Sequence, residues 1–172
     1  MKNYFDLTGQ VAIVTGCSTG LGVQMAKALA NQGCNIAALA RRKEMIDNVA
    51  AEIEKEFGVK AIGVQCDITD TARVEAAVDE VYKTFGRIDI LINNAGTGAV
   101  APAEDITDDQ FQGEMNIDLF GTFKVSRAVA KKAMIPAGYG RIINIASMYG
   151  LVGNKIAGSA PYHAAKGGVV NL

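Results

Sequence analysis

The chain has 172 residues, of which 49% are apolar and 20% are charged, a composition typical of one globular domain with a substantial core. Its 17 basic and 18 acidic residues nearly balance and form no block of like charge, which argues against nucleic acid or a membrane surface as a partner. No apolar run reaches the roughly 18 residues of a membrane span, and the first residues lack the apolar core of a signal peptide, so we expect a cytoplasmic protein.

The first half of the chain alternates apolar runs with amphipathic stretches. In chain order the pattern predicts strand 11–15, helix 22–31, strand 35–40, helix 42–57, strand 61–65, helix 69–85 and strand 88–92. Gly33, Gly58 and Gly86 follow the three helices, at the position where a glycine commonly ends a helix. Thr69 or Asp70 is the expected N-cap of the third helix.

The second half begins with a long helical region, 107–135, which we expect Pro136 to end. A fifth strand, 141–146, and a glycine-rich loop follow, and Pro161 lies near the start of a last helix. Strands that are apolar throughout suggest a sheet covered on both faces. Right-handed strand–helix–strand crossovers then predict a single α/β domain over residues 1–172, a doubly wound parallel sheet with strand order 3-2-1-4-5.

Three cysteines, Cys17, Cys34 and Cys66, have a spacing that fits neither a zinc site nor a disulfide framework. We expect buried or half-buried thiols and no metal site. Because Cys17 lies within a glycine-rich turn, it is also expected to be sensitive to alkylation without being catalytic.

That turn joins the first strand to the first helix and favours a dinucleotide site. Gly16 can take the tight turn, Gly20 lets the backbone approach a pyrophosphate, and Gly22 allows close packing of helix on strand. The free N–H groups of the following helix would face the phosphates. The candidate cofactor-binding residues of the turn are Gly16, Ser18, Thr19, Gly20, Leu21 and Gly22. The alternative is a turn of purely structural value.

Residues after the next strands extend this site. Strand 35–40 ends without an acidic residue and is followed by Arg41, whose planar guanidinium could bind a ribose 2′-phosphate, so we expect NADP, with NAD possible. The alternative is that Arg41 and Arg42 form a solvated helix start. Asp67 could accept a hydrogen bond from adenine, with Ile68 beside it, or could cap a helix. Asn94, Ala95 and Gly96 follow the fourth strand and could form the cofactor floor, or only a turn.

The last helix carries a candidate proton-transfer pair. Tyr162 and Lys166 are four residues apart and therefore lie on one face of a helix. Free tyrosine, with a pKa of about 10, is a poor base at neutral pH, but a neighbouring lysine cation favours its phenolate form. Such a pair beside a dinucleotide indicates hydride transfer to or from a carbonyl.

Together these motifs resemble the short-chain dehydrogenase/reductase family, in its order and over essentially the whole chain. The motifs are the turn 15–22, the Asn-Asn-Ala-Gly of 93–96, Ser147, Tyr162 and Lys166. Segments 5–15 and 145–153 look more narrowly like gluconate 5-dehydrogenases and 3-oxoacyl-carrier-protein reductases. The resemblance implies a Rossmann fold, a small carbonyl or alcohol substrate, and a homo-oligomer.

The resemblance also implies roles for individual residues. Tyr162 would be the general acid in reduction and the base in oxidation, and Lys166 would support it and bind the nicotinamide ribose, so both are also candidate cofactor-binding residues. Ser147 would donate a hydrogen bond to the substrate oxygen. Tyr149 would line the substrate pocket or simply pack, and His163, the only histidine, is expected to be partly solvated and not catalytic.

Three features depart from the family pattern. Asp118 stands where the family usually has an asparagine that holds a water near the lysine, and its charge would stabilise Lys166 as a cation and compete with the phenolate. The segment between Ser147 and Tyr162 is about two residues longer than usual. The family's last two strands are absent from these 172 residues, which predicts a C-terminally truncated chain with strand five at an open edge. A non-catalytic or truncated dinucleotide-binding module is therefore the alternative function.

Overall fold

The computed structural model describes residues 4–98, 100–154 and 158–172. One five-stranded parallel sheet runs through it in the order β3-β2-β1-β4-β5, as predicted. In this register Val14 of the central strand lies between Ala38 and Ile92. The strands are β1 Val11–Thr15, β2 Asn35–Ala40, β3 Ala61–Gln65, β4 Ile90–Asn93 and β5 Arg141–Asn144.

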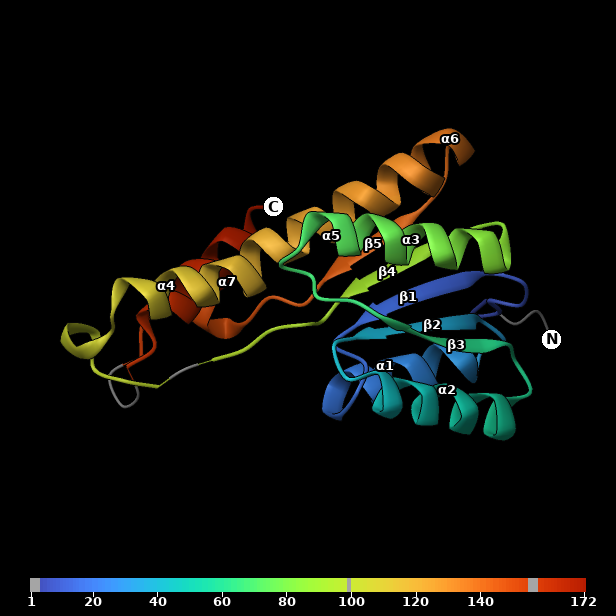
Figure 1. Cartoon of the computed structure of the whole chain (residues 1–172), viewed down its shortest axis with the longest axis horizontal. Coiled ribbons are helices and arrows are strands. Elements are labelled where there is room, and N and C mark those ends of the chain that lie inside the picture. The colour runs from blue at the N-terminus through green and yellow to red at the C-terminus, as the bar shows by residue number, and fades with distance from the viewer. Residues whose placement is uncertain (1–3, 99, 155–157) are drawn as a thin grey trace.

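Helices cover both faces of the sheet (Figure 1). Helices α1 (Gly20–Ala30) and α2 (Lys43–Phe57) pack on one face, and α3 (Thr71–Phe85) and α5 (Thr122–Val129) pack on the other. Because successive strand residues point to opposite faces, Val11 and Ile13 enter the core beneath α3, whereas Ala12 and Val14 enter the core beneath α1. The doubly covered sheet explains why the strands are apolar throughout.

The long helical region is continuous but not uniformly α-helical. It consists of α4 (Asp108–Met115), the π-helical turn η2 (Asn116–Gly121), α5, a second π-helical turn η3 (Ala130–Met134) and α6 (Ile135–Ala137). Thr107 begins it with a capping box, in which the Thr107 and Gln110 side chains each bond the other's backbone N–H. The helix was expected to end at residue 135, before Pro136, but it runs two residues further, to Ala137, because proline is tolerated in the first turn of α6, and Gly138, with a φ of +62°, ends the helix.

The observed bounds of several other helices and strands differ slightly from the predicted ones. The first helix begins at Gly20 instead of residue 22, β4 runs two residues later at its start, and β5 ends at Asn144. Asp70, not Thr69, caps α3, since its side chain accepts from the N–H groups of Ala72 and Arg73.

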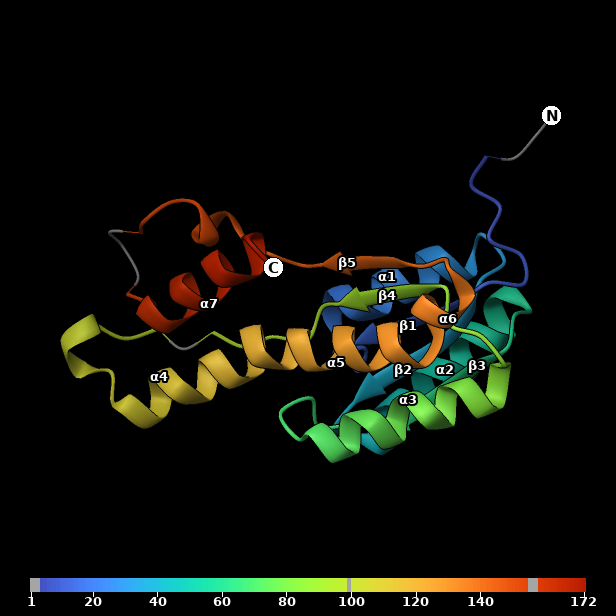
Figure 2. The ribbon, with the colours of Figure 1, turned by 90° about the horizontal axis from the view of Figure 1, so that it is seen from above.

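Helix α7 (Ala160–Val170) lies beside α4 in a lobe beyond the carboxyl ends of the strands (Figure 2). The short turn η4 (Met148–Gly150) packs on α7, and another, η1 (Ala103–Asp105), precedes α4. Among the described residues β5 pairs only with β4, and its Ile142 and Ile143 are 40% and 46% exposed, as expected for an edge strand. None of the described helices has the length and apolar character needed to cross a membrane.

Candidate active site

The glycine turn has the tight geometry that the sequence predicted. Gly16 and Gly20 adopt φ values of +66° and +62°, a region that side chains strongly disfavour. A Cβ on Gly22 would lie 2.5 Å from the Gly16 carbonyl oxygen, so this glycine is required by close packing. The turn ends at Thr19, which precedes α1 without capping it through its side chain. The Thr19 side chain therefore forms no hydrogen bond with the N–H groups of the first turn of α1, and such N–H groups are suited to bind an anionic ligand.

Asn94, which directly follows β4, holds the glycine turn in place through hydrogen bonds. Its side-chain Nδ2 donates to the carbonyl of Thr15 at 3.0 Å, and its backbone N–H donates to Thr15 Oγ1 at 3.0 Å. The backbone N–H of Ala95 donates to the same hydroxyl at 3.0 Å. Asn94 was predicted to shape a cofactor floor and to stabilise the sheet, and these bonds join the end of β4 to the end of β1.

We expect Gly22→Ala to weaken binding of NADPH by at least about tenfold, because overpacking of this kind costs about 1–3 kcal/mol and must displace the backbone of the turn. NADPH fluorescence titration of the variant measures the effect. Gly113→Ala is the matched control, since a Cβ there meets nothing within 4 Å and helix propensity favours alanine. Equal affinities for Gly22→Ala and the control would show that the turn does not hold the dinucleotide.

A cleft of about 720 Å³ opens in front of the turn, at the carboxyl ends of β1, β2 and β3. This is the place where parallel α/β sheets bind nucleotides. The cleft is lined by Gly16, Ser18, Thr19, Leu39, Ala40, Arg41, Arg42, Cys66, Asp67, Ile68, Ala95, Gly96, Thr97 and Ile117. Eight of the predicted cofactor residues are thus on its wall, while Gly20, Leu21, Gly22, Asn94, Tyr162 and Lys166 lie outside the lining set.

Two arginines stand at the β2 end of the cleft. Arg41 was predicted there, and it does line the cleft. The neighbouring Arg42 also lines it and donates from Nη2 to Ser18 Oγ at 2.7 Å, which joins the β2 end to the glycine turn. Sequence reasoning treated Arg42 only as part of a solvated helix start, because spacing cannot show across which gap a long side chain reaches.

Asp67 lies on the same wall and forms a local turn. Its Oδ1 accepts from the N–H of Thr69 at 3.0 Å and from its hydroxyl at 2.8 Å. The backbone bond from Thr69 holds the pKa of Asp67 below its usual range, against the opposing effect of burial. The helix cap itself is Asp70, so of the two readings of Asp67 the capping one is wrong.

The burial of the Cys17 thiol differs from what the sequence suggested. The sequence suggested a thiol open to alkylation, but Cys17 is fully buried and burial raises its pKa to about 12. Thiolate is the reactive form, so this side chain is inert in the folded state. Cys34 and Cys66 are also buried free thiols.

Lys166 and Asp118 form a buried ion pair at the other end of the site. Lys166 Nζ lies 3.1 Å from Asp118 Oδ1, and the two side chains are 6% and 0% exposed. Lys166 also donates to the carbonyl of Ile145 at 2.9 Å and lies 5.5 Å from the centre of the Tyr162 ring. The backbone N–H of Thr97 donates to Asp118 Oδ2 at 3.0 Å.

The pKa of Asp118 is raised above the usual carboxyl value, chiefly because burial disfavours the charged form. The Thr97 N–H and the Lys166 ammonium act in the opposite direction and lower it. Asp118 therefore depends on these two partners to remain a carboxylate in the interior.

The π-helical turn contains Asp118. A π turn adds a residue to the helix and so changes the direction in which the following side chains point. Asn116, two residues earlier, instead accepts from Gln112 Nε2 at 3.0 Å and is not at Lys166. Of these two residues it is Asp118 that contacts Lys166.

Ser147 and Tyr162 are connected through Tyr149. Ser147 Oγ accepts from the N–H of Tyr149 at 3.2 Å, which leaves its own O–H available as a donor. The Tyr149 ring meets the Tyr162 ring edge-on, with centroids 6.4 Å apart. Turn η4 can approach α7 because Gly150 has no side chain, since a Cβ there would lie 2.6 Å from the Lys166 carbonyl oxygen.

Gly96 and Thr97 form a wall shared by the cleft and the ion pair. Both residues line the cleft. A Cβ on Gly96 would lie 2.6 Å from Asp118 Oδ1 and 3.4 Å from Lys166 Nζ. The Asp118–Lys166 pair therefore lies directly behind this wall of the cleft, and the Tyr162 ring lies beside Lys166. A tyrosine beside a buried lysine, next to a nucleotide cleft, can serve acid–base chemistry on a ligand bound in that cleft.

A family model described as "short chain dehydrogenase" matches residues 10–172. Among curated proteins, D-threitol dehydrogenase of Mycolicibacterium smegmatis is 40% identical over 168 residues, which are 98% of this chain and 63% of that protein. Gluconate 5-dehydrogenase of Gluconobacter oxydans is 39% identical over 168 residues, 98% of this chain and 64% of that protein. The chain thus spans less than two thirds of the length of these relatives.

Solved structures agree with the fold. A crystal structure of an actinorhodin polyketide ketoreductase variant with NADPH superposes with a TM-score of 0.89 at 34% identity, covering 99% of this chain and 64% of that one. The structure of an NAD⁺-bound xylitol dehydrogenase gives a TM-score of 0.91 at 38% identity, covering 98% and 63%. Relatives of this fold therefore include both NADPH-bound and NAD⁺-bound enzymes.

Proposed function

The chain belongs to the short-chain dehydrogenase family, and from this premise we propose that the protein transfers hydride between NADP(H) and a small hydroxyl/ketone substrate. The observation that carries the proposal is the wall of Gly96 and Thr97, which separates a nucleotide-sized cleft from the buried Asp118–Lys166 pair. The substrate class we propose is sugar acids or 3-oxoacyl thioesters, because relatives are named gluconate 5-dehydrogenase and ketoacyl reductase.

The cleft fits a dinucleotide on structural grounds. Gly16 and Gly22 let the turn pack tightly against Ala95 and against its own backbone, and Thr19 leaves the start of α1 uncapped by its side chain. In the proposal Gly16, Ser18 and Thr19 hold the pyrophosphate, Arg41 and Arg42 the ribose phosphate, and Asp67, Ile68 and Ala95 the adenosine half. The bound dinucleotide supplies or accepts the hydride.

The protein's own residues manage position and protons. Tyr162 Oη gives a proton to the substrate oxygen in reduction and removes it in oxidation, and the Lys166 cation beside the ring favours the phenolate that results. Ser147, whose Oγ already accepts from the backbone N–H of Tyr149, donates a hydrogen bond to the same substrate oxygen and keeps its proton. Asp118 holds the Lys166 side chain in place through the 3.1 Å contact.

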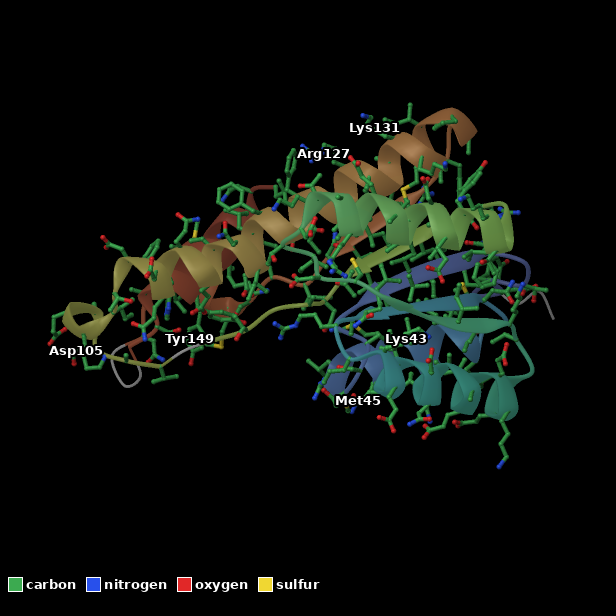
Figure 3. The ribbon with its side chains drawn as sticks, viewed as in Figure 1. Lys43, Met45, Asp105, Arg127, Lys131 and Tyr149 are labelled. Carbon is green, nitrogen blue, oxygen red and sulfur yellow. The ribbon has the colours of Figure 1, made fainter. Side chains whose placement is uncertain are left out.

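Cofactor preference can be tested at the two arginines. We expect Arg41→Ala and Arg42→Ala each to raise the Kd of NADPH by about 10- to 100-fold, because a hydrogen bond to a charged group contributes about 1.5–3 kcal/mol. The Kd of NADH should hardly change. Arg127→Ala, which removes an arginine from the outer side of α5 (Figure 3), is the matched control. Equal losses for NADPH and NADH would contradict the NADP assignment.

The function is tested by measuring NADPH binding and hydride transfer on one sample, with a scan of sugar acids and 3-oxoacyl thioesters. Turnover of one class supports the proposal and identifies the substrate. Binding without turnover of any ketone would instead favour the alternative, a dinucleotide-binding module without catalysis.

We also propose that the protein is a cytoplasmic homo-oligomer. Phe120 and Phe123 are 45% and 44% exposed at the junction of η2 and α5, where a second copy would cover them. The buried free thiols suit a reducing compartment. Sedimentation of wild type and Phe123→Glu tests the assembly, and an unchanged sedimentation coefficient would count against this surface.

A further inference from the structure

Tyr149 and His163 form an aromatic stack next to Tyr162 that the chemistry above does not use. The Tyr149 ring lies 4.8 Å from the His163 ring at an angle of 36°, and 6.4 Å from the Tyr162 ring at 74°. All three side chains are half-buried in the lobe of α4 and α7, where Figure 3 shows Tyr149. Tyr149 therefore contacts both Tyr162, the proposed proton donor, and His163, the residue that follows Tyr162 in the chain.

The His163 ring is fixed by its own helix. Its Nδ1 lies 2.7 Å from the carbonyl of Ser159, which also accepts the His163 backbone N–H at 3.0 Å. Because a carbonyl can only accept, Nδ1 carries the proton in this bond. Nε2 is buried and has no hydrogen-bond partner among the described residues. The ring is thus held by one hydrogen bond and by its contact with Tyr149.

Tyr149 is fixed at two places. Its backbone N–H donates to Ser147 Oγ at 3.2 Å, and its ring contacts the rings of both His163 and Tyr162. Moving this ring would disturb Ser147 and Tyr162 together, although they lie on different elements. A tilt of either group away from a substrate oxygen lowers the rate without removing any catalytic atom.

We infer that the Tyr149–His163 stack is a positioning device that sets the geometry of Tyr162 and Ser147 relative to each other. His163 acts through Tyr149, and the Tyr149 ring, not its hydroxyl, is the effective part. This inference concerns the efficiency of the proposed hydride transfer and rests on that function for its kinetic consequence.

The kinetic test uses the full chain with NADPH and the ketone identified by the substrate scan. Tyr149→Ala and His163→Ala should each lower kcat by about 3- to 10-fold, the range that an aromatic pair contributes, with the Kd of NADPH unchanged. Tyr149→Phe should recover most of kcat. The double variant should lose no more than the worse single variant, because both substitutions remove one device. Tyr139→Ala, at an exposed tyrosine that contacts Arg141, is the control and should keep wild-type kcat.

A structural readout does not require turnover. As the chain has one histidine, its ring resonances can be assigned directly, and those of Tyr162 by their loss in Tyr162→Phe. His163→Ala should shift the Tyr162 ring resonances, and Tyr149→Ala should shift those of His163.

A wild type that transfers no hydride would refute the proposed function alone. Unshifted resonances, a Tyr149→Phe as impaired as Tyr149→Ala, or additive losses would overturn the positioning role.

Discussion

Tyr162→Phe is expected to lower kcat for hydride transfer by about 10²- to 10⁴-fold while leaving NADPH binding almost unchanged. The variant keeps the ring that packs against Tyr149 and lies near Lys166, and it removes only the hydroxyl that carries the proton. The substrate oxygen would then have to exchange its proton with water. Steady-state kcat, followed by NADPH absorbance, and a fluorescence titration of NADPH measure the two effects separately.

Tyr139→Phe is the matched control for this experiment. It removes a hydroxyl from a 43% exposed ring outside the site, so kcat should equal that of the wild type. A Tyr162→Phe variant that retained kcat within about tenfold would assign the proton transfer to another group, since general acid–base catalysis usually contributes more.

The sheet and the glycine turn were predictable from sequence because both rest on local rules. Continuous apolar strands such as Val11–Thr15 indicate two covered faces, and the order of strands and helices leaves few topologies. Gly16 and Gly22 are required by a positive φ and by close packing, and few other residues satisfy either requirement.

What the sequence did not reveal depends on long side chains and on irregular helix geometry. The bond from Arg42 to Ser18 spans two loops, and no spacing rule encodes it. The π turn that contains Asp118 has no sequence signature, so the helix was predicted as regular. Asp118 was found through family resemblance alone, and the stack of Tyr149 on His163 was not predicted because it joins two separate segments.

The second large effect that we expect comes from breaking the ion pair between Lys166 and Asp118, which should lower the stability of the fold. We expect Lys166→Met to lower the free energy of unfolding by about 3–5 kcal/mol at neutral pH, because it leaves the Asp118 charge buried without its cation. The methionine fills much of the same volume, so loss of packing should be the smaller part. Urea unfolding measures the change, and kcat should fall as well, because Tyr162 loses its neighbouring cation.

The pH dependence of this loss identifies its cause. Burial raises the pKa of Asp118 in the folded protein above its unfolded value of about 3.9, so folding favours the protonated carboxyl. That contribution to stability is fully present below the unfolded value and is lost as the pH rises through the folded one. The deficit of Lys166→Met relative to wild type should therefore be small in acid and grow toward neutral pH. Adding Asp118→Asn should recover much of the stability but not kcat, since the buried charge disappears while the cation stays absent. A deficit that is independent of pH, or that survives in the double variant, would show that packing and not charge holds α7 against the π turn.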